Sequence, residues 1–337
     1  MPPSHARFAV FLCWVLVGCT QRSPEVAQTQ AAADPAEVKA EESEEQALSG
    51  FLLAGPPGAL TAPDTASEPT RIAADPTAAE PTPEVQDETA EALPPGMSCL
   101  LQAYPEQLCS GRGGTDAALI WCDGTEMLWD SQPEARDFEE LLEHPDLADM
   151  MAMSYPLGPD APIPAENEDP GRVRYAPFFA KMYGESKADV KMTLTKIPWG
   201  EKTLRVTTTN GVDTKLAEVR EEIEALSGDL KKTGLSTAGA FNWREVRGTG
   251  RLSSHSYAMA IDVGVEVSDF WNWNKPDKNG LYPYKNRFPA EIVALFEAHG
   301  FIWGGKWYHY DTMHFEYRPD LLLCGRTPND DAAGKTL

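Results

Sequence analysis

The chain has 337 residues and carries 52 acidic against 29 basic side chains, a formal net charge of −23. This excess of negative charge argues against a protein that binds nucleic acid, because phosphates attract basic surfaces. The length allows one domain with an elaboration, or two small domains, beside segments that do not fold.

The first residues are typical of an export signal. Arg7 precedes an apolar run at residues 8–17, which is too short to span a bilayer. The sequence LVGC that ends at Cys19 resembles a bacterial lipobox, which implies a signal peptide at residues 1–18 and lipidation of Cys19. Thr20 follows instead of Asp, and by resemblance to Gram-negative sorting rules this implies the outer membrane, facing the periplasm. An uncleaved anchor helix and simple secretion are the alternatives.

Residues 19–95 have the composition of a linker. From residue 20 to residue 95 there are 15 acidic and 3 basic residues, 11 of the 28 prolines, and Phe51 as the single aromatic residue. Such a stretch cannot bury enough apolar surface to offset the entropy of ordering it. We therefore expect an extended tether between the anchor and a folded domain.

Four cysteines lie beyond this linker: Cys99, Cys109, Cys122 and Cys324. An even number in an exported protein predicts two disulfides, with three possible connectivities. If all four pair, one bond must join Cys324 to the 99–122 segment. Their irregular spacing, without paired CxxC ligands, disfavours a metal site. We expect residues 96–200 to form a disulfide-containing elaboration, residues 201–325 the main domain, and residues 326–337 a tail.

Three stretches show helical patterns. Residues 138–151 have helical composition, and residues 215–230 repeat apolar side chains at helical spacing, which predicts a helix packed on a sheet. A third helix is expected to begin around Pro289 and to end at Gly300. Residues 156–171 are rich in Pro, Asp and Glu and predict a loop.

A strand with one apolar face is predicted over residues 257–267. Its odd positions are apolar, and Asp262 projects from the other face beside two small alanines. His255 precedes this strand, in the loop that enters it. Because the alanines beside Asp262 are small, they leave room there for a metal ion or a substrate.

A second strand is predicted around His314. Met313, Phe315 and Tyr317 form its apolar face, so that His314 and Glu316 point the opposite way. If the two strands are neighbours, His255, Asp262 and His314 converge, and two imidazoles with one carboxylate suit a catalytic zinc that keeps a position open for water. Asp311 has the wrong parity for that face and is expected in the entering turn, where it can act as a base.

These segments resemble a known family, the zinc peptidases of bacterial cell walls. The family includes D-alanyl-D-alanine carboxypeptidases, the D,D-peptidases of vancomycin resistance, and L-alanyl-D-glutamate endopeptidases. Its pattern is Ser-x-His, a small residue, Ala-x-Asp, and an acidic residue three positions before a second His. The chain matches this pattern with Ser253, His255, Ala260, Asp262, Asp311 and His314. The family usually has Gly where Ala258 stands, a mild departure because Ala is also small. Asp at position 311 and the run FIWGGKW at residues 301–307 are more similar to the L-alanyl-D-glutamate branch.

The resemblance covers about residues 205–320 and implies roles for single residues. The resemblance implies three ligands for one zinc ion: His255, Asp262 and His314. Asp311 corresponds to the base that takes a proton from the zinc-bound water. The family also uses an arginine upstream of the first histidine to hold substrate or stabilise the oxyanion. Arg244 is the candidate here, with Arg247 and Arg251 as competitors.

Several other side chains keep two interpretations. Glu316 is either a hydrogen-bond partner that orients a ligand histidine or a solvated strand residue. Three residues are candidates for substrate binding: Ser253, Trp303 and Trp307. The two tryptophans are as often core residues. His309 is expected to line the site or lie on the surface, and His299 to belong to a helix end.

We therefore expect an α+β fold, an antiparallel sheet with flanking helices and a zinc cleft, as in Hedgehog and D,D-peptidase folds. Residues 201–325 would be the zinc peptidase domain. The expected activity is hydrolysis of amide bonds in peptidoglycan stem peptides during wall remodelling, by a D-alanyl-D-alanine carboxypeptidase or an L-alanyl-D-glutamate endopeptidase. A wall-binding module that holds zinc without turnover is the alternative, which the presence of Asp311 disfavours. We expect a monomer, with peptidoglycan and the anchoring membrane as its partners.

Overall fold

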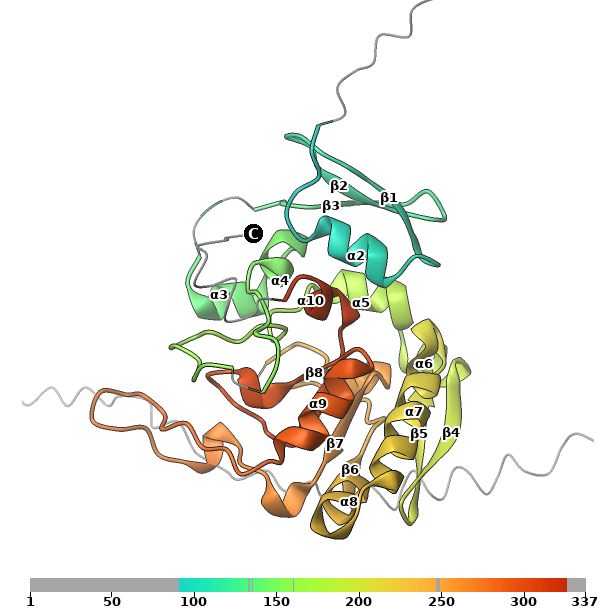
Figure 1. The fold of residues 1–337 in the computed structure, drawn as a ribbon. Coiled ribbons are helices and arrows are strands. Elements are labelled where there is room, and N and C mark those ends of the chain that lie inside the picture. The colour runs from blue at the N-terminus through green and yellow to red at the C-terminus, as the bar shows by residue number, and fades with distance from the viewer. Residues whose placement is uncertain (1–90, 133, 135, 160, 247–248, 326–337) are drawn as a thin grey trace, which may run out of the picture. The chain divides into compact units, whose positions relative to one another are not determined.

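The computed structural model describes residues 91–132, 134, 136–159, 161–246 and 249–325 (Figure 1). All of them fall within one compact unit. The predicted signal peptide, Cys19, the tail and nearly all of the linker lie outside the described residues. In the described part of the chain, no helix has the length and apolar character needed to cross a membrane.

The central sheet has four antiparallel strands in the order β6-β7-β9-β8. The strands are β6 (Thr237–Gly239), β7 (Ala260–Val263), β8 (Phe301–Trp303) and β9 (His314–Tyr317). On β7 and β9, Ile261 pairs with Phe315, and both side chains are fully buried. The Phe315 ring stacks on Phe296 of α9 (Ala290–Ala298) at 4.0 Å between centroids. One face of the sheet is thus closed by a helix, and the alternate side chains point to the other face.

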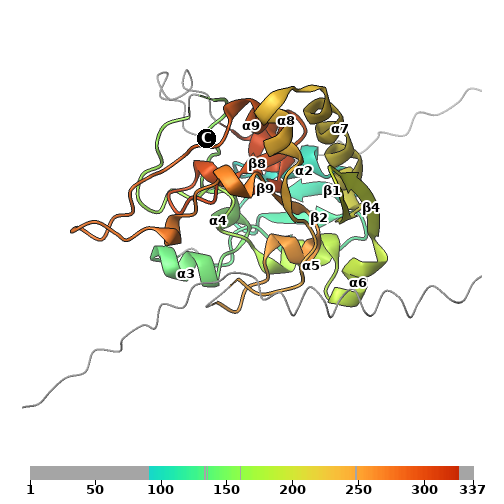
Figure 2. The same cartoon turned by 90° about the horizontal axis from the view of Figure 1, so that it is seen from below.

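Three helices in contact with one another cover the closed side: α7 (Val212–Ala225), α8 (Gly228–Leu235) and α9 (Figures 1 and 2). The apolar stripe of α7 is fully buried, in agreement with the periodicity of the sequence: Val212, Leu216, Val219 and Ile223. The helix predicted at residues 215–230 is nevertheless two helices, because Leu226 leaves the helical conformation and Gly228 has a positive φ of 60°.

A separate hairpin pairs β4 (Leu194–Trp199) with β5 (Lys202–Thr207) along the whole length of both strands. The boundary placed between residues 200 and 201 falls in the turn of this hairpin. Trp199 is fully buried, and its indole donates a hydrogen bond to the Gly234 carbonyl of α8 at 3.0 Å. The hairpin therefore belongs to the same core as the central sheet.

The segment before the hairpin holds five helices and a small sheet among the described residues. The helices are α2 (Met97–Ala103), α3 (Phe138–Glu143), α4 (Leu147–Met151), α5 (Ala176–Tyr183) and α6 (Lys187–Met192). The antiparallel sheet has the order β1-β2-β3, formed by β1 (Leu108–Arg112), β2 (Ala118–Trp121) and β3 (Glu126–Leu128). Buried side chains from this segment and from the central sheet form one hydrophobic core.

The two predicted disulfides are present. Cys99 of α2 pairs with Cys324, directly after α10 (Pro319–Leu323), and Cys109 pairs with Cys122. The first bond ties the start of the folded unit to its end, as the cysteine count required. The second closes the β1–β2 hairpin.

Two other predicted elements are shorter than expected. The strand predicted at residues 257–267 is only β7, because Ala258 and Gly264 adopt left-handed conformations with φ of 55° and 62° at its two sides. The helix predicted at residues 138–151 is interrupted before Asp146, whose side chain caps α4. The mixed α+β class with antiparallel sheets is confirmed, whereas the likeness to the Hedgehog fold stays a prediction.

Candidate metal centre

Two of the predicted ligands face each other across neighbouring strands. Asp262 on β7 is paired in register with His314 on β9. Their neighbours Ile261 and Phe315 point into the core, so the alternation of a strand sends Asp262 and His314 to the opposite face. The sheet itself therefore brings the carboxylate and the imidazole together.

His255 comes from the short 3₁₀ helix η2 (Ser254–Tyr257) that precedes β7. Ser253 caps this turn, with its hydroxyl accepting a hydrogen bond from the His255 backbone N–H at 3.4 Å. Ala258 closes the turn in the left-handed conformation, where the family resemblance places glycine. This tight turn brings His255 back over the first residues of the strand.

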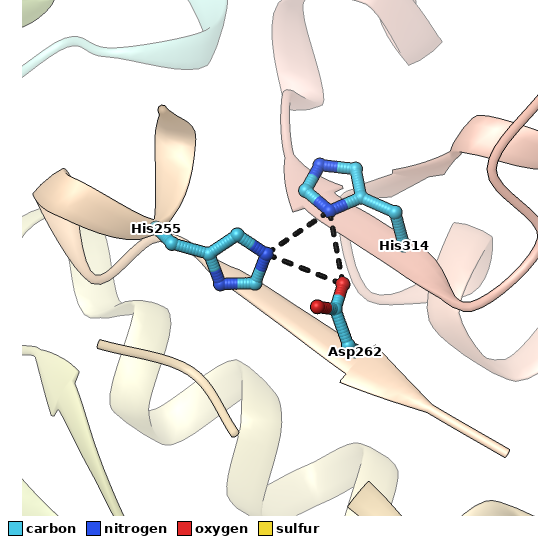
Figure 3. A group of neighbouring side chains, drawn as sticks. All are labelled: His255, Asp262 and His314. Carbon is cyan, nitrogen blue, oxygen red and sulfur yellow. Dashed lines mark hydrogen bonds and ion pairs between the residues drawn. The ribbon is translucent and has the colours of Figure 1, made fainter. Parts of the chain in front are cut away.

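The three side chains converge on one point (Figure 3). His255 Nε2, His314 Nδ1 and Asp262 Oδ1 are each 3.2 Å from the other two. Bonds of about 2.0 Å to a tetrahedral zinc ion place neighbouring ligand atoms about 3.3 Å apart. The spacing and the donor set of two imidazoles and one carboxylate therefore fit zinc, with a fourth position left for water or substrate.

The remaining nitrogen of each imidazole has a partner of its own. His255 Nδ1 donates to the Ala240 carbonyl at 2.6 Å, which leaves Nε2 free to bind a metal ion. His314 Nε2 lies 3.3 Å from both the Ser254 hydroxyl and Glu316 Oε2. These contacts fix the ring orientations before any ion binds.

The electrostatics of the centre favour a cation. Burial disfavours the charged form of Asp262, but the two histidines outweigh it and hold its pKa far below its usual range. Burial acts to lower the pKa of His314, but the hydrogen bonds that its imidazole donates to the Asp262 and Glu316 carboxylates outweigh burial and raise this pKa to about 9. The two carboxylates, Asp262 and Glu316, therefore place negative charge beside the imidazoles, and negative charge there attracts a cation.

Asp311 lies in the turn before β9, as expected, and is not a member of the ligand group. Its Oδ1 atom is buried and finds no hydrogen-bond donor among the residues that the structure describes. Burial first, and then the charge of Asp262, raise the pKa of Asp311 to about 6. A carboxylate with a free buried oxygen and a pKa near neutrality suits the transfer of protons to and from a water molecule.

Glu316 is a partner of the ligand histidine and not a solvated residue. It is fully buried, contacts His314, and accepts two hydrogen bonds from Arg174, at 3.0 Å from Nε and 2.5 Å from Nη2. Burial works to raise the pKa of Glu316, yet Arg174 and His314 keep it well below its usual range. Sequence reasoning missed Arg174, which precedes the motif by many residues and carries no spacing signal.

The three side chains expected to bind substrate are buried within the fold. Ser253 is buried as the cap described above. Trp303 is 5% exposed, and its indole donates to the Thr312 carbonyl at 2.8 Å. Trp307 is also buried, but its ring centroid lies 5.6 Å from that of His314. Of the two tryptophans, Trp307 is the one whose ring contacts the imidazole of a candidate ligand.

The arginine candidates occupy different environments. Arg244 is exposed, and its backbone N–H donates to the Ser256 hydroxyl in the turn of His255. Arg251 is bound to Glu143 of α3 at 3.1 Å. Arg247 lies outside the described residues. The geometry therefore does not choose one of them for the oxyanion.

The two other histidines considered above are not part of the ligand group. His309 Nδ1 donates a hydrogen bond to Asp169 Oδ2 at 2.6 Å, and the His309 ring stacks on Phe138 at 5.7 Å between centroids. His299 follows α9, where its nitrogens lie 3.0 and 2.9 Å from Glu218 and Glu222 of α7. His299 thus belongs to a helix end, as predicted.

A comparison with known families agrees with the motifs. A family model described as D-alanyl-D-alanine carboxypeptidase matches residues 247–317. The match contains all three ligand residues and Asp311, and it supports the predicted relation to peptidases of this kind. No curated protein and no solved structure matched the chain.

Proposed function

We propose that this protein is a zinc peptidase that hydrolyses an amide bond in the stem peptides of peptidoglycan. The observation that carries the proposal is the arrangement of His255, Asp262 and His314, with mutual distances of 3.2 Å, beside the buried free oxygen of Asp311. Ligands alone would serve a structural ion. Asp311 adds a separate carboxylate, one oxygen of which has no hydrogen-bond partner among the described residues, and such a group can carry the protons that hydrolysis must move.

The chemistry divides between the ion and the side chains. When bound, zinc activates a water molecule and polarises the carbonyl of the scissile amide. Asp311 takes the proton from the attacking water and passes it to the amine that leaves. Glu316 and Ser254 hold the His314 ring, and Arg174 keeps Glu316 ionised, so that the ligand geometry is fixed throughout.

Two substrates fit this proposal. The matched family model favours the terminal D-alanyl-D-alanine bond, whereas Asp at position 311 and the tryptophan-rich run at residues 301–307 resemble the L-alanyl-D-glutamate branch. We also propose that the protein acts in the cell envelope, anchored at Cys19 to the outer membrane and facing the periplasm, as a monomer.

The test is hydrolysis of defined muropeptides by the full chain, followed by mass spectrometry of the products. We expect one amide bond to be cut, activity to be lost with a chelator, and activity to return with zinc. The Asp311→Asn variant is the matched control. If the zinc-loaded wild-type protein cuts none of the peptides yet binds them, the protein is a wall-binding module and the proposed activity is wrong.

A further inference from the structure

A segment from outside the matched family region lies against the candidate metal centre. Residues 168–174, in the green connection between α4 and α5 in Figure 1, are fastened to residues 307–309. The Glu168 carbonyl accepts from the Tyr308 N–H at 3.0 Å, and the Pro170 carbonyl accepts from the Trp307 indole at 2.6 Å. Because the Trp307 ring contacts His314, this segment is held within one side chain of the ligands.

Close packing fixes the segment further. Gly171 has a positive φ of 97°, and a Cβ atom there would lie 2.4 Å from the Ile302 side chain of β8. Asp169 is fully buried, and its Oδ1 accepts from the His309 N–H at 2.9 Å. The side chains of this segment are therefore presented from a rigid backbone and not from a free loop.

The side chains of two arginines in this segment differ in how many of their hydrogen-bond donors are used. Within the part of the chain that the structure describes, the Arg174 guanidinium donates two hydrogen bonds, both to the Glu316 carboxylate. Arg172 makes one side-chain hydrogen bond among the described residues, from Nη1 to Asp169 Oδ2 at 3.3 Å. The same oxygen lies 2.6 Å from His309 Nδ1, so Asp169 makes a shorter hydrogen bond with His309 than with Arg172. Most of its five donors remain available.

The surroundings of Arg172 suit an anion. Its side chain is 20% exposed, and burial lowers its pKa while Asp169 opposes the shift. Arg174 and Arg251 add further positive charge within electrostatic range, and Asp311 of the candidate site lies within the same range. A partly desolvated guanidinium with unused donors gains most from a planar carboxylate, which accepts two parallel hydrogen bonds.

We propose that Arg172 binds a carboxylate group of the stem peptide next to the scissile amide, and so selects substrates that carry this group. The inference rests on the proposed function and adds a substrate-binding residue to it. It also gives the segment before the hairpin a place in the site.

The test measures binding and turnover separately, with the full zinc-loaded chain. Stem peptides are prepared with each carboxylate in turn converted to a carboxamide. Their dissociation constants are measured by calorimetry on the Asp311→Asn background, with Arg172 intact, as Arg172→Gln and as Arg172→Lys. KM and kcat follow from the variants with Asp311 intact.

One lost charge-assisted pair should weaken binding by about 10- to 100-fold. We expect Arg172→Gln to weaken binding and raise KM by this factor, with kcat little changed, and Arg172→Lys to restore part of the loss. With Arg172 intact, one of the carboxamide peptides should bind weakly, about as weakly as the unmodified peptide binds to the Arg172→Gln variant. The Arg172→Gln variant should bind this carboxamide and the unmodified peptide equally well. Arg287→Gln, which removes an exposed charge paired with Asp269, should still distinguish them.

Three results would overturn the inference. They are an unchanged dissociation constant in Arg172→Gln, an equal preference for the carboxylate in both proteins, and no binding of any stem peptide. Binding that depends on Arg172 without any cleavage would contradict the proposed hydrolysis alone.

Discussion

Asp262 and His314 sit opposite each other on β7 and β9, and their nearest ligand atoms are 3.2 Å apart. The strand register sets this distance, so the fold itself positions two side chains of the candidate metal site. His255 completes the group from a turn that Ser253 caps. A site preformed in this way pays little reorganisation on binding a metal ion.

The first prediction concerns the metal. The wild-type protein should hold one zinc ion, and His255→Ala and His314→Ala should each remove it, because two ligands do not make a stable zinc site in water. Metal analysis after gel filtration measures this. His299→Ala is the control, since that imidazole is bound by two glutamates of α7 and should leave the zinc content unchanged. Zinc retained in both site variants would disprove the assignment.

The second prediction separates the base from the ligands. Asp311→Asn keeps the size of the side chain but cannot take up a proton, and Asp311 is not in the ligand group. The variant should bind zinc normally and lose about 10²- to 10⁴-fold in rate. Paired measurements of zinc content and muropeptide hydrolysis check this. A zinc-loaded variant with near-normal turnover would assign the base to another group.

The grouping of His255, Asp262 and His314 was predictable because their positions follow from short-range rules. Alternation along two strands placed Asp262 and His314 on one face, and the family motif added His255. The ends of the first strand were not predictable, since Ala258 adopts a left-handed conformation that non-glycine residues seldom take. The whole strand pattern at residues 257–267 was apolar at odd positions, yet its two ends are 3₁₀ turns.

The supporting residues were not predictable in the same way. Arg174 reaches Glu316 across 142 positions of sequence, and Asp169 reaches His309 across 140. No periodicity or spacing connects residues so far apart. These pairs depend on how the segment between α4 and α5 packs on the sheet, which only the folded structure determines.

The third prediction concerns the anchor, which lies outside the described residues. If Cys19 carries a lipid, Cys19→Ser should move the protein from the membrane fraction to the soluble periplasmic fraction. Hydrolysis of soluble muropeptides by the purified variant should be unchanged, because the candidate site is built from residues 168–316. Fractionation with a Cys13→Ser control tests the first part. Membrane association that persists in Cys19→Ser would contradict lipidation at this residue.

The fourth prediction is a loss of stability in alkali. Tyr183 is buried with its ring against Phe179 and Tyr257, and burial raises its pKa above the ordinary value of 10.0. Since the folded pKa is the higher one, the stability that this group contributes is fully present below pH 10 and is lost as the pH rises through the folded value. Tyr183→Phe should reduce the fall in unfolding free energy above pH 10 by up to about 1.4 kcal/mol per pH unit.

Urea unfolding at a series of alkaline pH values measures this slope. The variant keeps the ring and loses the hydrogen bond from Asn210 Nδ2, which is 3.2 Å long. A constant offset between the two proteins at every pH would report that hydrogen bond alone. Only a change in slope supports the buried ionisable hydroxyl, and parallel curves would contradict it.

The last prediction compares the two disulfides. In the chain-entropy account, a crosslink stabilises by restricting the unfolded chain, and more so for a longer loop. The Cys99–Cys324 bond spans 225 positions and the Cys109–Cys122 bond spans 13, which gives about 5 and about 3 kcal/mol respectively. Replacing Cys99 and Cys324 together by Ala should therefore cost more unfolding free energy than replacing the other pair.

The long bond also joins α2 to the end of α10, so its loss should loosen the packing of Met97 and Leu100 at the start of the folded unit. Chemical denaturation of the two double variants in parallel measures the difference. A larger loss for the Cys109–Cys122 pair would show that local strain or packing, and not loop length, governs the contribution of these bonds.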